Sequence, residues 1–419
     1  MDRRRNAVYL IVVLSLLAGL VTGRGFFFNV AYVFIGLLIF SFLWAWSGAS
    51  QLRLRRQTRA RRAQVGHFLE EHFTVHNRGV FPKLWIEVYD QSDLPGHRAS
   101  QVVSNLGPRG EVSWSVRTPC VRRGAFQLGP LRIVTGDPFG LFQAERKISA
   151  VSPLVVYPPT VHLVEFALPV GMLPGGDALR RRAHHITTNA AGVRDYAPGD
   201  SFSRIHWRST ARKNRLIVKE FELDPLADIW VMLDAERTVH TGDYEPGQHD
   251  LIWAFSQQDA PFAIPSTTEE YAVTIAASLV THFLQRDRAV GFITHGRHRE
   301  AIQADRGSRQ LTKILEALAI CEARGAVTFG QLMSSYGNQF PRGTTTVLVT
   351  PSTRDDWVMA AYSYLQRGLR VVAILIDGQS FGGRPGAQQL ALRLGAMNIP
   401  TYIVRRNDDL QLSLSRPRV

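Results

Sequence analysis

Arginine and carboxylate side chains gather in one short stretch of this sequence, between residues 192 and 212. Guanidinium groups bind carboxylates and phosphates through paired hydrogen bonds, so this stretch could bind an acidic partner or clasp two domains together. We expect its charged groups to form a network around a central Trp207, and the packed junction is the favoured interpretation. The residues assigned to this role are Arg194, Asp195, Tyr196, Gly199, Asp200, Arg204, His206, Trp207 and Arg212.

A hydrolase is the catalytic alternative for the same stretch. Asp200, His206 and Ser209 nominally supply the acid, base and nucleophile of a serine hydrolase. The sequence around Ser209 lacks the glycine-bounded turn that strains such a nucleophile, and the chain has no P-loop or dinucleotide-binding glycine motif. We therefore expect a protein that is not an enzyme.

The run GVRDYAPGDSFSRIHWRSTAR over residues 192–212 resembles a known family. It is similar to the bacterial and archaeal domain of unknown function 58 family, and the upstream runs GAFQLGPL and DPFGLF also resemble that family's β domain. The resemblance implies a membrane anchor, a C-terminal domain like the von Willebrand factor A domain, and a protein partner of the MoxR-type AAA+ ATPase class.

That resemblance also implies a place for a metal. A von Willebrand factor A-like strand would end in Asp-x-Ser-x-Ser, whose oxygens hold a divalent cation. Here the strand ending at Leu233 is followed by Asp234, Ala235, Glu236, Arg237 and Thr238. Asp234 and Thr238 would be the ligands if Mg²⁺ bound. Because the middle hydroxyl is replaced and Arg237 adds a positive charge, we expect no cofactor.

Two uncharged apolar runs lie near the N-terminus, from Ala7 to Val21 and from Phe26 to Trp46. Each is close to the roughly 18–20 residues that cross a bilayer as a helix, and only a short turn separates them. This predicts a transmembrane helical hairpin over residues 7–46. Arginines flank both outer ends, so we expect a two-pass protein of the inner cell membrane with both termini in the cytoplasm. A cleaved signal peptide is the alternative for the first run.

The formal net charge of the 419-residue chain is +14. Such a charge could indicate nucleic-acid binding. Much of the excess lies beside the apolar runs, where anionic lipid explains it, so we expect the lipid bilayer as a partner and no nucleic acid.

The remaining sequence divides into three parts. Residues 64–165 alternate apolar and polar types between frequent turns, which predicts an immunoglobulin-like β-sandwich. Residues 186–226 hold the family signature. Residues 227–410 alternate strand and helix patterns, which predicts a doubly wound α/β domain with a mostly parallel sheet. Its predicted strands cover 229–234, 289–294, 345–350 and 371–377, and its predicted helices cover 267–286, 308–323, 357–366 and 388–397.

Together these features favour a membrane-anchored scaffold that works with a MoxR-type AAA+ ATPase on the assembly or activation of envelope proteins. The alternative is metal-dependent binding of a protein ligand by the C-terminal domain without any ATPase.

Overall fold

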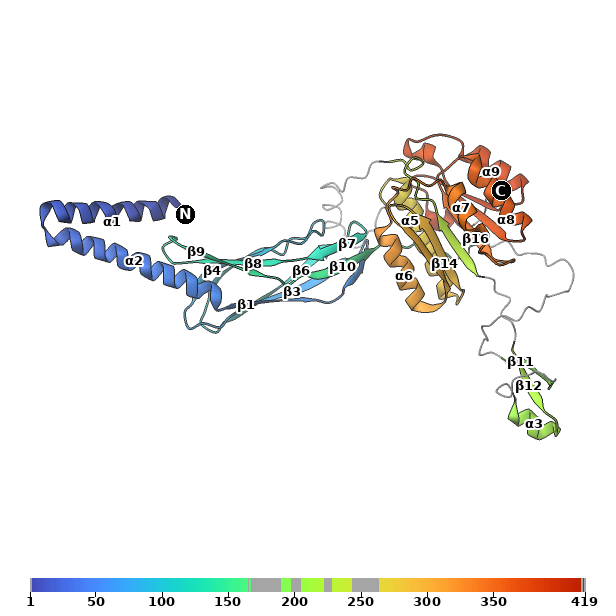
Figure 1. The fold of residues 1–419 in the computed structure, drawn as a ribbon, viewed down its shortest axis with the longest axis horizontal. Coiled ribbons are helices and arrows are strands. Elements are labelled where there is room, and N and C mark those ends of the chain that lie inside the picture. Colours follow the sequence, from blue (N-terminus) through green and yellow to red (C-terminus); the bar gives the residue numbers. More distant parts are fainter. Residues whose placement is uncertain are drawn as a thin grey trace. The chain divides into compact units, whose positions relative to one another are not determined.

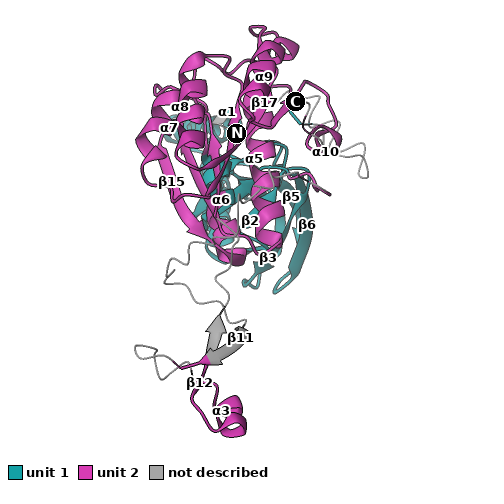
Figure 2. Ribbon diagram, turned by 90° about the vertical axis from the view of Figure 1, so that its right-hand side faces the viewer, with its two compact units in different colours: residues 1–159, 244–265, 315–320 teal, residues 160–243, 266–314, 321–419 magenta. Residues whose placement is uncertain are grey.

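The computed structural model describes residues 2–164, 166, 190–196, 205–221, 228–242, 264–415 and 417. The chain divides into two compact units (Figure 2). Unit 1 comprises residues 1–159, 244–265 and 315–320, and unit 2 comprises residues 160–243, 266–314 and 321–419.

Unit 1 begins with two helices, α1 (Asp2–Thr22) and α2 (Gly25–Ser50), which lie antiparallel in Figure 1. Both are long and apolar enough to cross a membrane by length and composition. Each extends past the predicted limits of residues 7–46, because the flanking arginines and the small residues after Trp46 continue the helices without a break.

The strand region of unit 1 follows α2 directly. Its strands are β1 (Leu52–Thr58), β2 (Arg62–Gln64), β3 (Phe68–Asn77), β4 (Lys83–Asp90), β5 (Gln101–Leu106), β6 (Glu111–Pro119), β7 (Gly124–Leu128), β8 (Leu131–Gly136), β9 (Gln143–Ile148) and β10 (Ser152–Tyr157). They form three sheets with the orders β1-β3-β6, β5-β4-β8-β9 and β2-β10-β7. The first two sheets share one core, in which Leu54 and Phe73 of one meet Ile86 and Ile133 of the other.

This strand region starts at residue 52, earlier than the predicted boundary at 64. Leu52 and Leu54 are buried while Arg53 and Arg55 are exposed, so β1 has the period-two pattern of a half-buried strand. The arginines of this segment had been interpreted as the charged flank of the second transmembrane helix, and not as part of a strand.

One of these arginines belongs to a buried charge cluster in unit 1. Arg56 contacts Asp90, and its Nε lies 3.4 Å from a carboxylate oxygen of Glu71. His97 Nε2 lies 2.9 Å from Asp90. Burial raises the pKa of Asp90, but hydrogen bonds from His97 and Ser92 and the charge of Arg56 outweigh it and hold the pKa at about 2. This contribution to stability is complete above the unfolded value of about 4 and is lost as pH falls through about 2.

Unit 2 contains a six-stranded sheet with the order β15-β14-β13-β16-β17-β18, in which only β15 is antiparallel to its neighbour. The strands are β13 (Ile229–Leu233), β14 (Val290–His295), β15 (Arg299–Asp305), β16 (Thr345–Thr350), β17 (Arg370–Ile376) and β18 (Thr401–Val404). The helices are α5 (Thr268–Gln285), α6 (Gly307–Ile320), α7 (Phe329–Gly337), α8 (Asp355–Gln366), α9 (Ala387–Ala396) and α10 (Leu410–Ser413), with a 3₁₀ turn η2 (Gly378–Phe381). The last turns of α6 group with unit 1.

Helices α7, α8 and α9 share a core with one face of this sheet, where Trp357 and Tyr364 pack against Met232 and Leu348. Helix α5 contacts β13, β14, β16 and β17. The predicted α/β architecture with a mostly parallel sheet is confirmed. The edge strands β15 and β18 and the short helices α7 and α10 lie in stretches that had received no prediction.

Unit 2 also holds a small two-stranded sheet, β11 (Ala190–Asp195) paired with β12 (Ile217–Phe221), and the short helix α3 (Trp207–Lys213). These elements carry the described part of the signature segment.

The buried cluster gives a first prediction. Replacing Arg56 by Met (Arg56→Met) leaves two buried carboxylates without their cation and should lower the opening free energy of β1 and β3 by about 3–5 kcal/mol. Amide hydrogen exchange of the full chain in detergent measures this value strand by strand.

Arg59→Met is the matched control, because Arg59 forms an exposed ion pair with Glu70 at 3.0 Å. Its cost should stay below about 1 kcal/mol. Equal effects of the two substitutions would show that the buried cluster does not stabilise the sheets.

Candidate functional site

The carboxyl ends of β13 and β16 lie side by side in unit 2, with Leu233 opposite Val349. Within the sheet, β13 lies between β14 and β16. The next strand along the chain, β14, pairs with one edge of β13, and β16 pairs with the other edge. The strand order therefore reverses at this point, and ligands of open α/β sheets bind at such a switch point. The loops that follow the two strands, residues 234–241 and 351–354, form what we call the strand-edge site.

Asp234 forms the floor of the strand-edge site and is almost completely buried. One of its oxygens accepts a hydrogen bond from Thr350 Oγ1 at 2.6 Å, and the other accepts one from the Glu236 amide at 3.0 Å. Burial raises the pKa of Asp234, while the charge of His240 and these hydrogen bonds act in the opposite direction. Both carboxylate oxygens are therefore already bonded within the protein.

Arg354 supplies the positive charge of the strand-edge site. Its Nη1 lies 2.8 Å and 3.1 Å from the two carboxylate oxygens of Glu236, and its Nη2 donates to Thr238 Oγ1 at 3.0 Å. The Thr238 hydroxyl in turn donates to Glu236. The side chain of Glu236 is 5% exposed and that of Arg354 is 44% exposed. A buried carboxylate thus holds a half-exposed guanidinium at the switch point.

These residues do not fit a divalent cation in this arrangement. Mg²⁺ requires about six oxygen ligands in octahedral geometry. The oxygens of Asp234, Glu236 and Thr238 are engaged by protein donors, and the Arg354 guanidinium lies against two of the three side chains. Within the described ranges, no group of three or more His, Cys, Asp or Glu residues could hold a metal ion.

The cation at this edge differs from the predicted one. Arg237 is exposed, and its amide bonds to the Gly325 carbonyl at 3.0 Å. Arg354, from the loop after β16, carries the charge instead. Thr350 and Arg354 were not predicted, because the expected ligands all came from the segment after the strand ending at Leu233. The available signal was the pairing of β16 with β13, which brings the two loops together.

The signature segment differs in part from the expected packed junction. Gly199, Asp200 and Arg204 lie outside the described residues, as does the side chain of Arg194, whose backbone lies in β11. Trp207 is 67% exposed, so it is not the buried centre of a charge network in the described part of the segment.

The other signature residues have local partners. Asp195 pairs with Arg215 at 3.1 Å, a partner that the sequence pattern did not reveal. The Tyr196 amide bonds to the Leu216 carbonyl at 2.9 Å. Arg212 is exposed in the last turn of α3, where a cation complements the helix dipole.

His206 and Ser209, two members of the nominal triad, form a helix cap. His206 is the N-cap of α3, and its Nδ1 accepts a hydrogen bond from the Ser209 amide at 3.2 Å and lies 2.7 Å from Ser209 Oγ. This geometry satisfies a free amide in the first turn of a helix. It explains both residues without catalysis.

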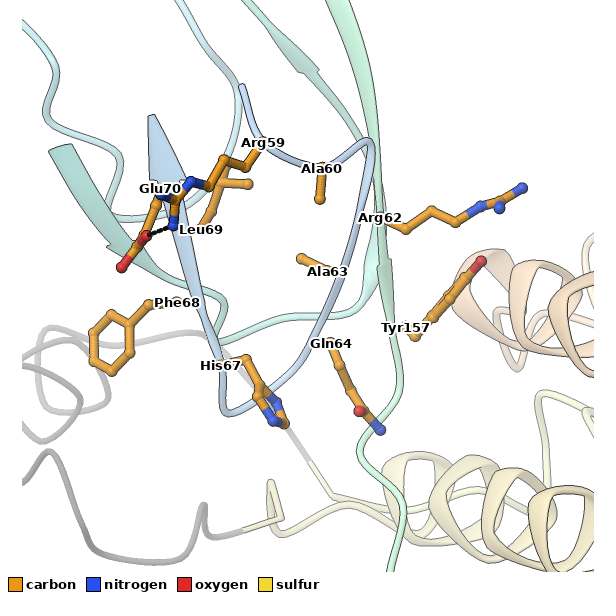
Figure 3. Close-up of a pocket in the computed structure, with 10 residues that line it drawn as sticks. All are labelled: Arg59, Ala60, Arg62, Ala63, Gln64, His67, Phe68, Leu69, Glu70 and Tyr157. Atoms are coloured by element: carbon orange, nitrogen blue, oxygen red, sulfur yellow. Dashed lines mark hydrogen bonds and ion pairs between the residues drawn. The ribbon is translucent and has the colours of Figure 1, made fainter. Parts of the chain in front are cut away.

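A cavity of about 410 Å³ lies in unit 1 near β2 and the start of β3 (Figure 3). Arg59 and Glu70 lie at one end and are already paired at 3.0 Å. Arg62 and Phe68 point away from the centre of the cavity in Figure 3. Since its charged groups do not converge, we assign the strand-edge site, and not this cavity, as the candidate functional site.

Comparison with known proteins gives the family context of this site. Residues 192–380 match the family described as "Protein of unknown function DUF58". The predicted family resemblance is confirmed. The DUF58 region contains β13, β16 and Arg354, and hence the whole strand-edge site, together with the described signature residues.

A similar protein is the "Uncharacterized protein YeaD" of Bacillus subtilis (strain 168), which is 22% identical over 342 residues, or 79% of this chain and 78% of YeaD. Among solved structures, the CARDB domain of the PF1109 protein from Pyrococcus furiosus covers 25% of this chain and 86% of its own, at 14% identity and a TM-score of 0.18. The β-glucosidase from Listeria innocua in complex with isofagomine covers 25% of this chain and 16% of its own, also at 14% identity and a TM-score of 0.18. These TM-scores are too low to bear on the function of the DUF58 region.

The strand-edge site gives a second prediction. Arg354→Met should leave the buried Glu236 carboxylate without its cation, with the Thr238 hydroxyl still donating to it. Loss of the charged partner costs about 1–3 kcal/mol or more. Faster amide hydrogen exchange in the segments 229–240 and 345–358 would report this loss.

Arg393→Met is the control, since Arg393 pairs with Asp355 at 2.6 Å on the exposed surface of the same unit. It should change exchange little, because exposed pairs contribute less than about 1 kcal/mol. Unchanged exchange in Arg354→Met would contradict the assigned role of the pair.

Proposed function

We propose that this chain is a membrane-anchored adaptor without enzymatic activity, whose strand-edge site binds an acidic segment of a protein partner. The hairpin α1–α2 crosses the inner membrane twice and leaves both termini in the cytoplasm. The flanking arginines support this orientation through the positive-inside rule. The lipid bilayer is thus one partner, and the proposal includes no nucleic acid.

The half-exposed Arg354 guanidinium carries the proposal. Glu236 and Thr238 hold Nη1 and Nη2 in fixed positions, and Arg354 Nε makes no hydrogen bond to a described residue. A guanidinium fixed in this way loses little side-chain entropy when it binds a second carboxylate. A glutamate or aspartate of a partner could share it with Glu236.

The order of the six-stranded sheet supports a von Willebrand factor A-like domain, and the two sheets around one core in unit 1 support an immunoglobulin-like sandwich. In the first of these folds a metal ion would link the strand edge to a carboxylate of the ligand. Here the Arg354 guanidinium would bind the ligand carboxylate in place of a metal ion, so no cofactor is needed.

The family resemblance suggests the identity of the partner, a MoxR-type AAA+ ATPase that acts on the assembly or activation of envelope proteins. The exposed Trp207 and Arg212 of the signature segment would add a second contact surface, since exposed Trp and Arg are common at the centres of protein interfaces.

A third prediction tests the adaptor function. The tagged full-length protein in detergent should retain the ATPase of its own cell in the presence of ATP. Arg354→Glu places like charges against an acidic segment and should weaken retention at least about tenfold, which corresponds to about 1.4 kcal/mol. Binding is measured by titration with the purified ATPase.

Arg393→Glu is the control for general charge effects and should bind like the native chain. Failure of the native protein to retain the ATPase with ATP present would remove that partner. Equal binding by the native chain and Arg354→Glu would remove the strand-edge site from the interface.

The alternative function, metal-dependent binding of a protein ligand, gives a fourth prediction. Calorimetric titration of the full-length protein with Mg²⁺ should show no binding heat for the native chain or for Asp234→Ala, because protein donors occupy the oxygens of the site. Binding heat in the native chain that Asp234→Ala abolishes would favour the alternative instead.

A further inference from the structure

Two apolar turns of unit 1 lie beside the last turns of helix α2. The Phe81 turn (residues 78–82) joins β3 to β4, and the Phe139 turn (residues 137–142) joins β8 to β9. We propose that both turns insert into the membrane interface on the side of the strand region, while neighbouring arginines bind anionic lipid headgroups. The proposal rests on the membrane anchor of the proposed function and extends it to the strand region.

Aromatic contacts fix the level of the two turns along α2. The Phe139 ring lies 6.5 Å from the Phe40 ring, the Phe142 ring lies 5.7 Å from the Phe42 ring, and the Phe81 ring lies 5.5 Å from the Trp44 ring. On the α1 side, the Arg5 guanidinium lies 5.9 Å from the centre of the Phe142 ring. The turns therefore lie alongside the helices, not beyond their ends.

The length of α2 shows how deep these contacts lie in a bilayer. Its 26 residues span about 39 Å at about 1.5 Å per residue. A hydrocarbon core is about 30 Å thick. If α2 begins at the boundary of this core on the side away from the strand region, only about its last six residues extend beyond the opposite boundary. Trp44 then lies near that boundary, and Phe40 lies about 6 Å deeper. A strand region that keeps its contacts with Phe40 and Trp44 must bring Phe139 and Phe81 to the lipid.

Both turns are held rigid by buried polar side chains. Asn77 Nδ2 donates to the Phe81 carbonyl at 2.9 Å, and Asn77 Oδ1 accepts from the Gly79 amide at 3.0 Å. Asp137 accepts from the Phe139 amide at 2.9 Å and from the Phe142 amide at 2.6 Å. These bonds satisfy backbone amides and carbonyls that would otherwise be costly to bring into a bilayer.

The side chains at the tips are exposed within the protein. Val80 is 63% exposed, and Phe81 and Phe139 are each 50% exposed. Exposing an aromatic side chain to water has an unfavourable free energy. At a lipid interface the same side chain is buried, which removes its apolar surface from solvent.

Exposed arginines surround the same end of the strand region. Arg146 binds the carbonyls of Ser50 and Leu52, and the Arg78 amide binds the Gln51 carbonyl, so these two residues flank the exposed Arg53 at the start of β1. Arg55 follows on the same exposed face of β1. The like charges of these arginines repel one another, and anionic phosphate headgroups would relieve that repulsion. The bilayer fits both the apolar tips and this charge, whereas an acidic protein would match only the charge.

A fluorescence experiment on the full-length protein tests the proposal. Cysteines introduced by Phe81→Cys, Phe139→Cys or Ala60→Cys are labelled with a polarity-sensitive dye and reconstituted into vesicles of phosphatidylcholine and phosphatidylglycerol. Ala60 is the control, because it is exposed and follows the far end of β1. The two native thiols are buried and react slowly.

Nitroxide-labelled lipids should quench the dye at positions 81 and 139 at least about twofold more than the dye at position 60, and aqueous iodide should show the reverse order. Flotation with the vesicles reports the anchor separately. Floating protein with equal iodide quenching at all three positions would overturn the insertion of the turns and leave the anchor standing. Protein that does not float would overturn both.

A second set of vesicles, made of phosphatidylcholine alone, tests the arginines. Protection from iodide at position 81 should fall in these vesicles and recover with phosphatidylglycerol. Equal protection in both lipid mixtures would overturn the headgroup contacts.

Discussion

The guanidinium of Arg146 binds the carbonyls of Ser50 and Leu52, each at 3.1 Å, at the point where α2 becomes β1. It satisfies the Ser50 carbonyl, which the end of the helix leaves free, and its charge complements the helix dipole. Only Gln51 separates α2 from β1, and the Gln51 carbonyl accepts a bond from the Arg78 amide at 2.9 Å. The apolar helix and the strand region are therefore one continuous body, and the depth of α2 in a bilayer fixes the position of the strands.

The arginines after the second apolar run have different environments and therefore different roles. Arg56 is buried against Asp90 and Glu71 in the core of unit 1, Arg53 and Arg55 point outward from β1, and Arg59 forms an exposed pair with Glu70. In unit 2, Arg354 again pairs with a buried carboxylate but remains half exposed. A buried cation stabilises the fold, whereas a half-exposed one can also bind a partner.

Much of the architecture could be predicted because it rests on local patterns. The apolar runs predicted the two helices, and alternating strand and helix patterns predicted β13, β14, β16 and β17 within a residue or two. Both edge strands of this sheet were missed. The alternating exposed and half-buried residues of β15 carry little of the apolar signal of the central strands, and β18 has only four residues. The start of β1 was missed because charge was weighed above the alternation of Leu52 and Leu54.

The strand-edge site could be predicted only in part. Asp234 and Thr238 were named because the family resemblance implies a ligand motif directly after a strand, which is a local feature of the sequence. The pairing of Glu236 with Arg354 joins residues far apart in the chain, and it depends on the register of β13 against β16. A single sequence does not reveal that register. Similarly, the exposure of Trp207 depends on packing that the signature pattern does not specify.

The depth of the α2–β1 junction in the membrane shows whether α2 and the strand region move as one body. Nitroxide spin labels at positions 32, 46 and 55 of the reconstituted full-length protein can be compared by their collision rates with oxygen and with a water-soluble nickel complex. We expect collisions with oxygen to dominate at position 32, the two rates to be balanced near position 46, and collisions with nickel to dominate at position 55. Nickel access at position 32, or lipid protection at position 55, would contradict an anchor that ends where the strands begin.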